Sequence, residues 1–233
     1  MKIAVINFSG NVGKSTIARH LLLPRIPGAD LIAIESLNAD EGQGQALRGR
    51  QFGELQEYVQ TVDNVVVDIG ASNVEELMAQ MQRYRGSHED FDAFVVPTVP
   101  ALKQQQDTIA TLIELSRIGV PASRLKLVFN MVETGVKVEQ AFDPLLAFLK
   151  QQPIAKANLN CKLGENEIYG RIKGTKTDLA SLASDPTDYK ALIVQAKGVN
   201  EKLALAQKLA TRRLACGVVP ELDACFGALE LRS

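Results

Sequence analysis

Short apolar runs alternate along the chain with longer segments in which apolar residues recur every three or four positions. The apolar runs predict buried strands and the periodic segments predict helices. Strands are expected at residues 3–6, 31–36, 64–70, 91–100 and 125–130, with a weaker sixth at 157–163. Helices are expected at residues 16–23, in the segment that leads to Tyr58, from 72 past 81, and at 102–116, 136–152 and 199–216. Such alternation with short turns predicts an α/β fold, a doubly wound, mostly parallel sheet flanked by helices.

The first strand leads directly into a glycine-containing loop and then a helix. In SGNVGKST, Gly10 and Gly13 lie in the loop, and Lys14 and Ser15 lie in the first turn of the helix. Backbone N–H groups and the positive end of the helix dipole would cradle a di- or triphosphate, Lys14 would neutralise its oxygens, and Ser15 would hold Mg²⁺. Phe8 stands where the usual pattern has glycine, so an ordinary glycine turn is the alternative.

The segment NVVVDIG, residues 64–70, carries the second chemical signal. Its three valines are typical of a strand buried on both faces of a parallel sheet, and Asp68 and Gly70 follow at the carboxyl end. A carboxylate there can order Mg²⁺ through water, and Gly70 can bring a backbone N–H to a γ-phosphate. Ser72 and Glu75 supply a capping box for the next helix, which leaves Asp68 for this role.

Polar residues follow several of the expected strands. Because parallel strands end at one edge of the sheet, one pocket is expected to gather the loop Gly10–Ser15, Glu35, Asp68, Pro97 and Asn130. The polar segments 36–46 and 70–73 are expected to respond to the γ-phosphate.

Composition adds limits to this picture. The chain has 233 residues and a net charge of −1, so it has no overall basic field to attract nucleic acid. Cys161, Cys216 and Cys225 are far apart and odd in number, which favours reduced thiols and a cytoplasmic protein. No apolar run approaches membrane-spanning length. One domain is expected over residues 1–233, with a C-terminal helical region at about 197–233.

Basic side chains accompany the leucines of the expected last helix, residues 199–216. They include Lys202, Lys208, Arg212 and Arg213. Three interpretations stay open: a face for DNA, a face for an acidic membrane surface, or the solvated side of a helix.

Together these motifs resemble the ParA/MinD family of phosphate-loop ATPases, over roughly residues 1–135. SGNVGKST is similar to that family's KGGVGKTT loop, NVVVDIG to its Asp-bearing third strand, FDAFVVPTVP to its strand that ends in proline, and LVFNMVE to its base-reading strand. A further resemblance is to the StbB group of plasmid-stability proteins.

The resemblance implies ATP and Mg²⁺ as cofactors and a role for each matching residue. Lys14, Asp68 and Glu35 would be catalytic, and Ser15 and Asp68 would hold the metal. Nucleotide would be bound by Gly10, Asn11, Val12, Gly13, Lys14, Ser15, Thr16, Gly70 and Asn130, the last through adenine. Implied partners are an adaptor or DNA-binding protein, DNA directly or through that partner, and a second copy in a nucleotide-dependent homodimer; membrane contact stays open.

Two departures bear on that mechanism. Ser9 occupies the position of the family's lysine that reaches across a dimer to the partner's ATP, and Leu37 replaces the second of two acids, with Glu35 as the first and Asn38 and Asp40 close behind. Hydrolysis is therefore expected to be slow or partner-stimulated.

Three functions fit these residues. The first is a nucleotide-switched ATPase in plasmid stability, partition or DNA positioning. The second is a recruitment module that binds nucleotide with little hydrolysis, favoured by Ser9 and Leu37. The third is an ATP-dependent ligase resembling dethiobiotin synthetase, for which Lys103 is a candidate substrate contact.

Overall fold

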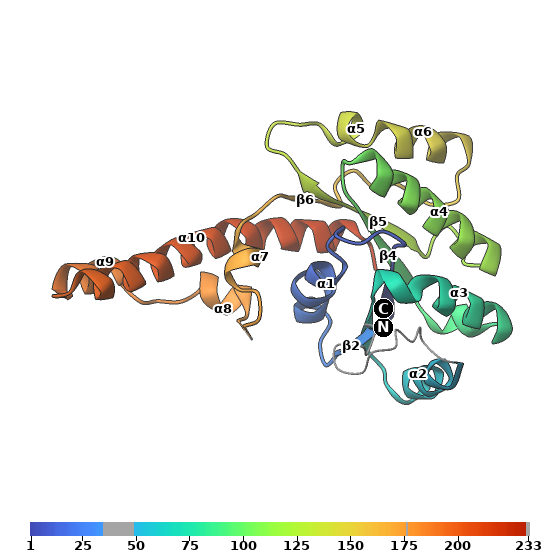
Figure 1. The fold of residues 1–233 in the computed structure, drawn as a ribbon, viewed down its shortest axis with the longest axis horizontal. Helices are drawn as coiled ribbons and strands as arrows, with labels where there is room; N and C mark the ends of the chain where they lie inside the picture. Colours follow the sequence, from blue (N-terminus) through green and yellow to red (C-terminus); the bar gives the residue numbers. More distant parts are fainter. Residues whose placement is uncertain (35–48, 176, 232–233) are drawn as a thin grey trace.

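The computed structural model describes residues 1–34, 49–175 and 177–231. Its strands are β1 (Lys2–Val5), β2 (Asp30–Ile34), β3 (Val65–Ile69), β4 (Ala93–Thr98), β5 (Leu125–Val132) and β6 (Lys162–Gly164). They form one six-stranded sheet in the order β2-β3-β1-β4-β5-β6, and every neighbouring pair is parallel (Figure 1). The predicted parallel sheet is confirmed.

Helices cover both faces of this sheet because alternate strand residues are apolar on both sides. Ala4, Val67 and Phe94 pack on one face against α2 (Gly49–Thr61), α3 (Val74–Arg83), α4 (Leu102–Ile118), α5 (Val138–Ala141) and α6 (Asp143–Gln151). Ile3 and Val5 pack on the other face against η1 (Ile17–Leu22), α7 (Ile168–Arg171), α8 (Leu179–Ala183) and α10 (Val199–Ala228). The fold is therefore doubly wound.

The helix after the glycine loop is less regular than expected. An α-helical turn, α1 (Lys14–Thr16), passes into η1, which is a π-helix, and then into a 3₁₀ turn, η2 (Leu23–Arg25). Among the remaining elements, η3 (Ala71–Asn73) and η4 (Ser87–Asp90) are 3₁₀ turns, and α9 (Tyr189–Gln195) lies beside α10 (Figure 1).

Two strands differ from the predicted ends. Pro97 lies within β4, paired with Val128, and the strand ends one residue later at Thr98. β5 continues past Asn130 to Val132, with a register shift against β6 and a left-handed backbone at Met131 (φ 55°). Asn130 is therefore inside the strand, directly before the left-handed residue Met131.

Helix lengths also differ from the prediction. The expected helix at 136–152 is divided at Phe142, so that α6 starts with Pro144 in its first turn. The last helix runs on to Ala228 and contains Pro220, because four residues of its second half, Ala215, Val218, Leu222 and Cys225, are buried against the sheet. Of the helices in the described residues, none has both the length and the apolar character needed to cross a bilayer.

Candidate nucleotide-binding site

The loop between β1 and α1 curves tightly through two left-handed residues. Asn11 (φ 57°) and Gly13 (φ 88°) have left-handed backbones, and the Gly13 carbonyl accepts the N–H of Ile17 to begin the helix. A Cβ atom added at Gly13 would lie 2.3 Å from Nδ2 of Asn130. Glycine at this position is therefore required both by conformation and by space.

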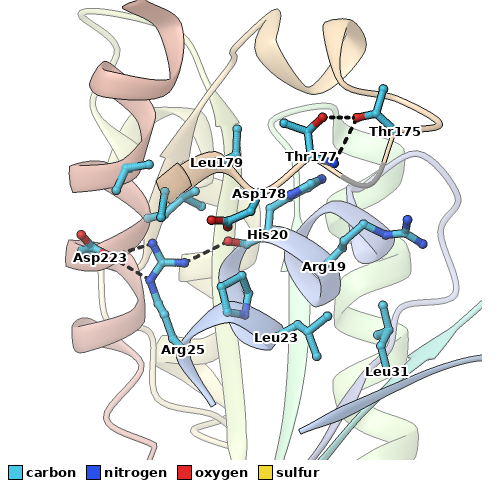
Figure 2. A pocket seen from close by; sticks show the side chains of 14 residues that line it. Arg19, His20, Leu23, Arg25, Leu31, Thr175, Thr177, Asp178, Leu179 and Asp223 are labelled. Atoms are coloured by element: carbon cyan, nitrogen blue, oxygen red, sulfur yellow. Dashed lines mark hydrogen bonds and ion pairs between the residues drawn. The ribbon is translucent and has the colours of Figure 1, made fainter. Parts of the chain in front are cut away.

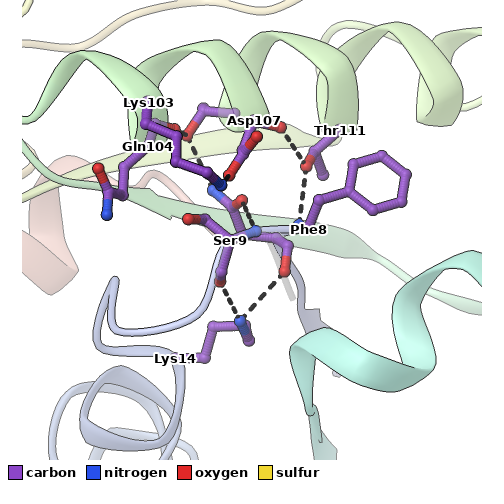
Figure 3. A network of polar contacts seen from close by, with 9 residues as sticks. Phe8, Ser9, Lys14, Lys103, Gln104, Asp107 and Thr111 are labelled. Atoms are coloured by element: carbon purple, nitrogen blue, oxygen red, sulfur yellow. Dashed lines mark hydrogen bonds and ion pairs between the residues drawn. The ribbon is translucent and has the colours of Figure 1, made fainter.

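Lys14 folds back over the loop instead of extending into solvent. Its Nζ donates to the carbonyl of Ser9 at 2.6 Å and to the carbonyl of Asn7 at 3.1 Å, and the residue is 8% exposed (Figure 3). Burial lowers the pKa of Lys14, and the negative charge of Asp68 opposes that shift. An ammonium group is thus held at the mouth of the loop next to the carboxylate.

Asp68 reaches this place through the register of the sheet. It is paired with Val5, the last residue of β1, and is 5% exposed. The end of β3 therefore sets a carboxylate beside the end of β1, where the glycine loop starts, and its role toward Mg²⁺ stays a prediction. Such a buried carboxylate near a lysine is typical of functional sites.

Gly70 and Asn73 both contact the carbonyl of Ile34. The N–H of Gly70 donates to it at 2.9 Å, and Nδ2 of Asn73 donates at 3.1 Å. The bond between Gly70 and a γ-phosphate stays a prediction, and it requires this N–H to leave Ile34. The capping box of Ser72 and Glu75 is wrong: the chain enters α3 through the 3₁₀ turn η3, so Asn73 is the N-cap residue, and no side chain caps the helix there.

Asn7 is a buried residue of this site that sequence reasoning missed. Its Nδ2 donates to the carbonyl of Pro97 and to Oγ1 of Thr108, both at 2.8 Å, while its Oδ1 accepts the N–H of Ser9. One amide thereby joins the start of the loop to β4 and α4. Its only sequence signal is a polar residue directly after a buried apolar run.

Helix α4 holds the loop at two further points. The N–H of Phe8 donates to Oγ1 of Thr111 at 3.1 Å (Figure 3). The ion pair with Lys103, at 2.9 Å, lowers the pKa of Asp107, and a weaker contribution of the same sign comes from a hydrogen bond with Ser9. Ser9 is 4% exposed, so the side chain at this position turns toward α4.

The remaining predicted residues take three kinds of position. Gly10, Asn11 and Ser15 are exposed at the rim of the loop, Thr16 is half-buried, and Val12 is buried beneath it. Asn130 is 5% exposed, and its Nδ2 donates to the carbonyl of Val12 at 2.9 Å. Asn130 therefore supports the loop, and its contact with adenine stays a prediction. Glu35, Leu37, Asn38 and Asp40 lie outside the described residues.

A cavity of about 620 Å³ lies beside the helix that follows the loop, away from Lys14 and Asp68. His20, Arg25 and Asp178 line it together with apolar residues of α8 and α10 (Figure 2). Arg25 is held there by Asp223 and by the carbonyls of His20 and Leu21. This cavity is separate from the phosphate loop. Lys103, the candidate substrate contact of a ligase, is exposed and paired with Asp107 on α4.

Comparison with known proteins supports the fold more than any particular activity. No model of a known protein family matches the chain, and no curated protein sequence matches it. Apo McdA from Cyanothece is similar in structure, with a TM-score of 0.54 and 13% identity over 89% of this chain and 98% of McdA. The chain therefore shares the fold of McdA, a parallel sheet covered by helices on both faces.

Two further structures are less similar. An McdA variant from Cyanothece in complex with ATP gives a TM-score of 0.49 at 14% identity, over 90% of this chain and 96% of the other. A putative plasmid partition protein from Borrelia burgdorferi bound to AMPPNP gives 0.46 at 14% identity, over 76% and 91%.

Proposed function

We propose that this chain is a ParA/MinD-like ATPase that acts as a nucleotide-dependent switch in plasmid stability, partition or DNA positioning. The observation that carries the proposal is Lys14: it is buried in a glycine loop, bonded to two loop carbonyls, and faces Asp68 from the neighbouring strand. Burial of a charged lysine costs stability, so its presence here is better explained by binding of an anion than by a contribution to folding.

The residues fit ATP and Mg²⁺. The left-handed backbone at Asn11 and Gly13 shapes the loop for phosphate oxygens, and Lys14 is close enough to exchange its carbonyl partners for them. Ser15 and Asp68 are the oxygen donors for the metal, which would neutralise phosphate charge when bound.

The chain's own groups then have distinct tasks in this proposal. Lys14 binds phosphate, and Asp68 orients a water molecule or the metal's shell. Asn130 supports the loop from β5, and Asn7 ties the start of the loop to β4. The role in plasmid or DNA positioning rests on the resemblance of the four motifs, and so do the adaptor protein, the DNA contact, the homodimer and the cytoplasmic location.

A recruitment module with little hydrolysis is the second candidate, and one observation favours it. The side chain at position 9 is buried and bonded to Asp107, so it does not extend outward as a side chain reaching a partner's nucleotide must. Nucleotide binding without turnover would follow if that contact is needed for hydrolysis.

ATP turnover and nucleotide binding by the purified chain test the proposal, with Lys14→Ala beside wild type and with or without duplex DNA. Removing the contact between Lys14 and the phosphate should lower turnover by about 10²-fold or more. Lys150→Ala removes an exposed lysine of α6 and is the matched control, expected to behave as wild type.

The outcomes separate the candidates. Turnover that responds to DNA and is lost in Lys14→Ala supports the positioning ATPase. Binding of ATP without turnover, lost in the same variant, supports the recruitment module. Wild type that binds no nucleotide refutes both.

A further inference from the structure

A helical arm projects from the body of the molecule. We use the term arm for residues 189–214, which comprise α9 and the first half of α10 (Figure 1). α10 has 30 residues and is therefore about 45 Å long. All four of its buried residues lie in the half that follows the arm, at Ala215 and beyond.

The body end of α10 is firmly attached, and so is the base of the arm. Asp223 pairs with Arg25, Glu221 accepts the N–H of Gly164, and the carbonyl of Ala228 accepts Nδ2 of Asn158. At the base, Arg212 donates to the carbonyl of Thr187 at 2.6 Å and stacks over the ring of Tyr189. The arm is thus held in place while its tip stands clear of the sheet.

The tip of the arm is apolar. Val199 is 82% exposed and Val194 is 80% exposed, the two highest values among the large apolar side chains of the described residues. Leu203, one turn after Val199, is 56% exposed, and Leu192 is exposed as well. Several exposed apolar side chains at the end of a projecting element indicate a surface for interaction with another molecule or a membrane.

The same arm is strongly basic. It carries Lys190, Lys197, Lys202, Lys208, Arg212 and Arg213 against one carboxylate, Glu201, a net charge of +5. The whole chain carries −1, so positive charge is concentrated on the arm. Lys197 and Lys202 lie near Val199 in the sequence together with Glu201, whereas Lys190, Arg212 and Arg213 lie together at the base of the arm.

We propose that the tip of the arm docks on an anionic lipid bilayer. Exposed apolar side chains at the end of a basic arm are what a peripheral membrane contact requires: the apolar groups enter the interface, and Lys197 and Lys202 meet lipid phosphates. DNA would account for the positive charge of the arm. It would not bury Val194 and Val199, because contacts with DNA phosphates are polar. Two paired arms would bring their positive charges together, and the repulsion would disfavour a dimer through this surface.

Vesicle flotation with the full purified chain tests this. Vesicles of phosphatidylcholine alone are compared with vesicles that also contain phosphatidylglycerol, without nucleotide, so the result does not depend on ATPase activity. Wild type should float with the anionic vesicles only, and less so at high salt. Val194→Asp with Val199→Asp should lower binding about tenfold or more, and Lys197→Glu with Lys202→Glu should do the same.

Matched controls change equivalent residues on the body. Val136→Asp replaces an exposed valine, and Lys150→Glu reverses an exposed lysine; both should bind vesicles as wild type does. Circular dichroism spectra that match wild type show that the variants fold.

Three results overturn the proposal. The first is wild type that fails to float with anionic vesicles, or tip variants that float as well as wild type. The second is that wild type binds DNA but not vesicles, and that only the lysine variants lose DNA binding. The third is a dimer in sedimentation that the valine variants abolish without any effect of lipid.

Discussion

Gly13 and Asn130 make a direct contact between the phosphate loop and β5, and Gly13→Ala tests how much that contact limits the loop. The new Cβ would lie 2.3 Å from Nδ2 of Asn130, and the backbone has φ 88°. The left-handed conformation alone costs alanine about 1 to 2 kcal/mol. Forcing the Asn130 amide away from the carbonyl of Val12 leaves buried groups unpaired, for about 1 to 3 kcal/mol more.

Gly86 provides a matched control for the first of these costs. It has φ 90°, and a Cβ added there would meet nothing within 4 Å. Gly86→Ala should therefore lower the free energy of unfolding by about 1 to 2 kcal/mol and Gly13→Ala by about 2 to 5 kcal/mol. The chain has no tryptophan, so urea unfolding is followed by far-ultraviolet circular dichroism.

A double-mutant cycle isolates the clash. In an Asn130→Ala background the amide is absent, so Gly13→Ala should cost only about 1 to 2 kcal/mol, as at Gly86. An equal cost of Gly13→Ala in both backgrounds, or a cost no greater than that of Gly86→Ala, would refute the reasoning.

Three further predictions concern buried and paired groups. Asn7→Ala removes three hydrogen bonds of a fully buried amide and should lower the free energy of unfolding by about 2 to 4 kcal/mol in urea titrations; a smaller effect than 1 kcal/mol contradicts the bracing role. Asp107 has a pKa lowered from 3.8, so its stabilisation is present above pH 3.8 and is lost as the pH falls through the folded-state pKa. The difference in unfolding free energy between wild type and Asp107→Asn should therefore shrink as the pH is lowered. A difference that does not change with pH would show that the carboxylate charge does not contribute to stability. Burial raises the pKa of the Cys161 thiol to about 11 and of the Cys225 thiol to about 12, whereas Cys216 is exposed. Iodoacetamide at pH 8 should therefore label Cys216 first in the native protein, as peptide mass spectrometry would show, and rapid labelling of all three would contradict the burial.

Local patterns in the sequence predicted the strands and the position of the glycine loop after β1. The valines of residues 65–67 can be buried only in a sheet covered on both faces, and the glycines and Lys14 at the end of β1 need no distant information. Asp68 followed from the same logic, because a parallel register brings strand ends together.

Features that depend on contacts far along the chain could not be predicted. Asn7 pairs with Thr108, and nothing local in either segment shows it. The irregularity at Met131 arises where β5 meets β6, and it keeps Asn130 inside the strand. Local propensity predicts that the last helix ends before Pro220. In the structure it continues past Pro220, where Val218 and Leu222 are buried against the sheet.

The bonds from Asn7, Phe8 and Ser9 to α4 have a mechanical consequence. These three consecutive residues at the start of the loop are bonded to Thr108, Thr111 and Asp107, which lie close together on one helix. If these hydrogen bonds stay intact, a large displacement of the loop must move α4 as well. Lys103, which is exposed on α4 and paired with Asp107, is therefore a surface residue that should move together with the loop.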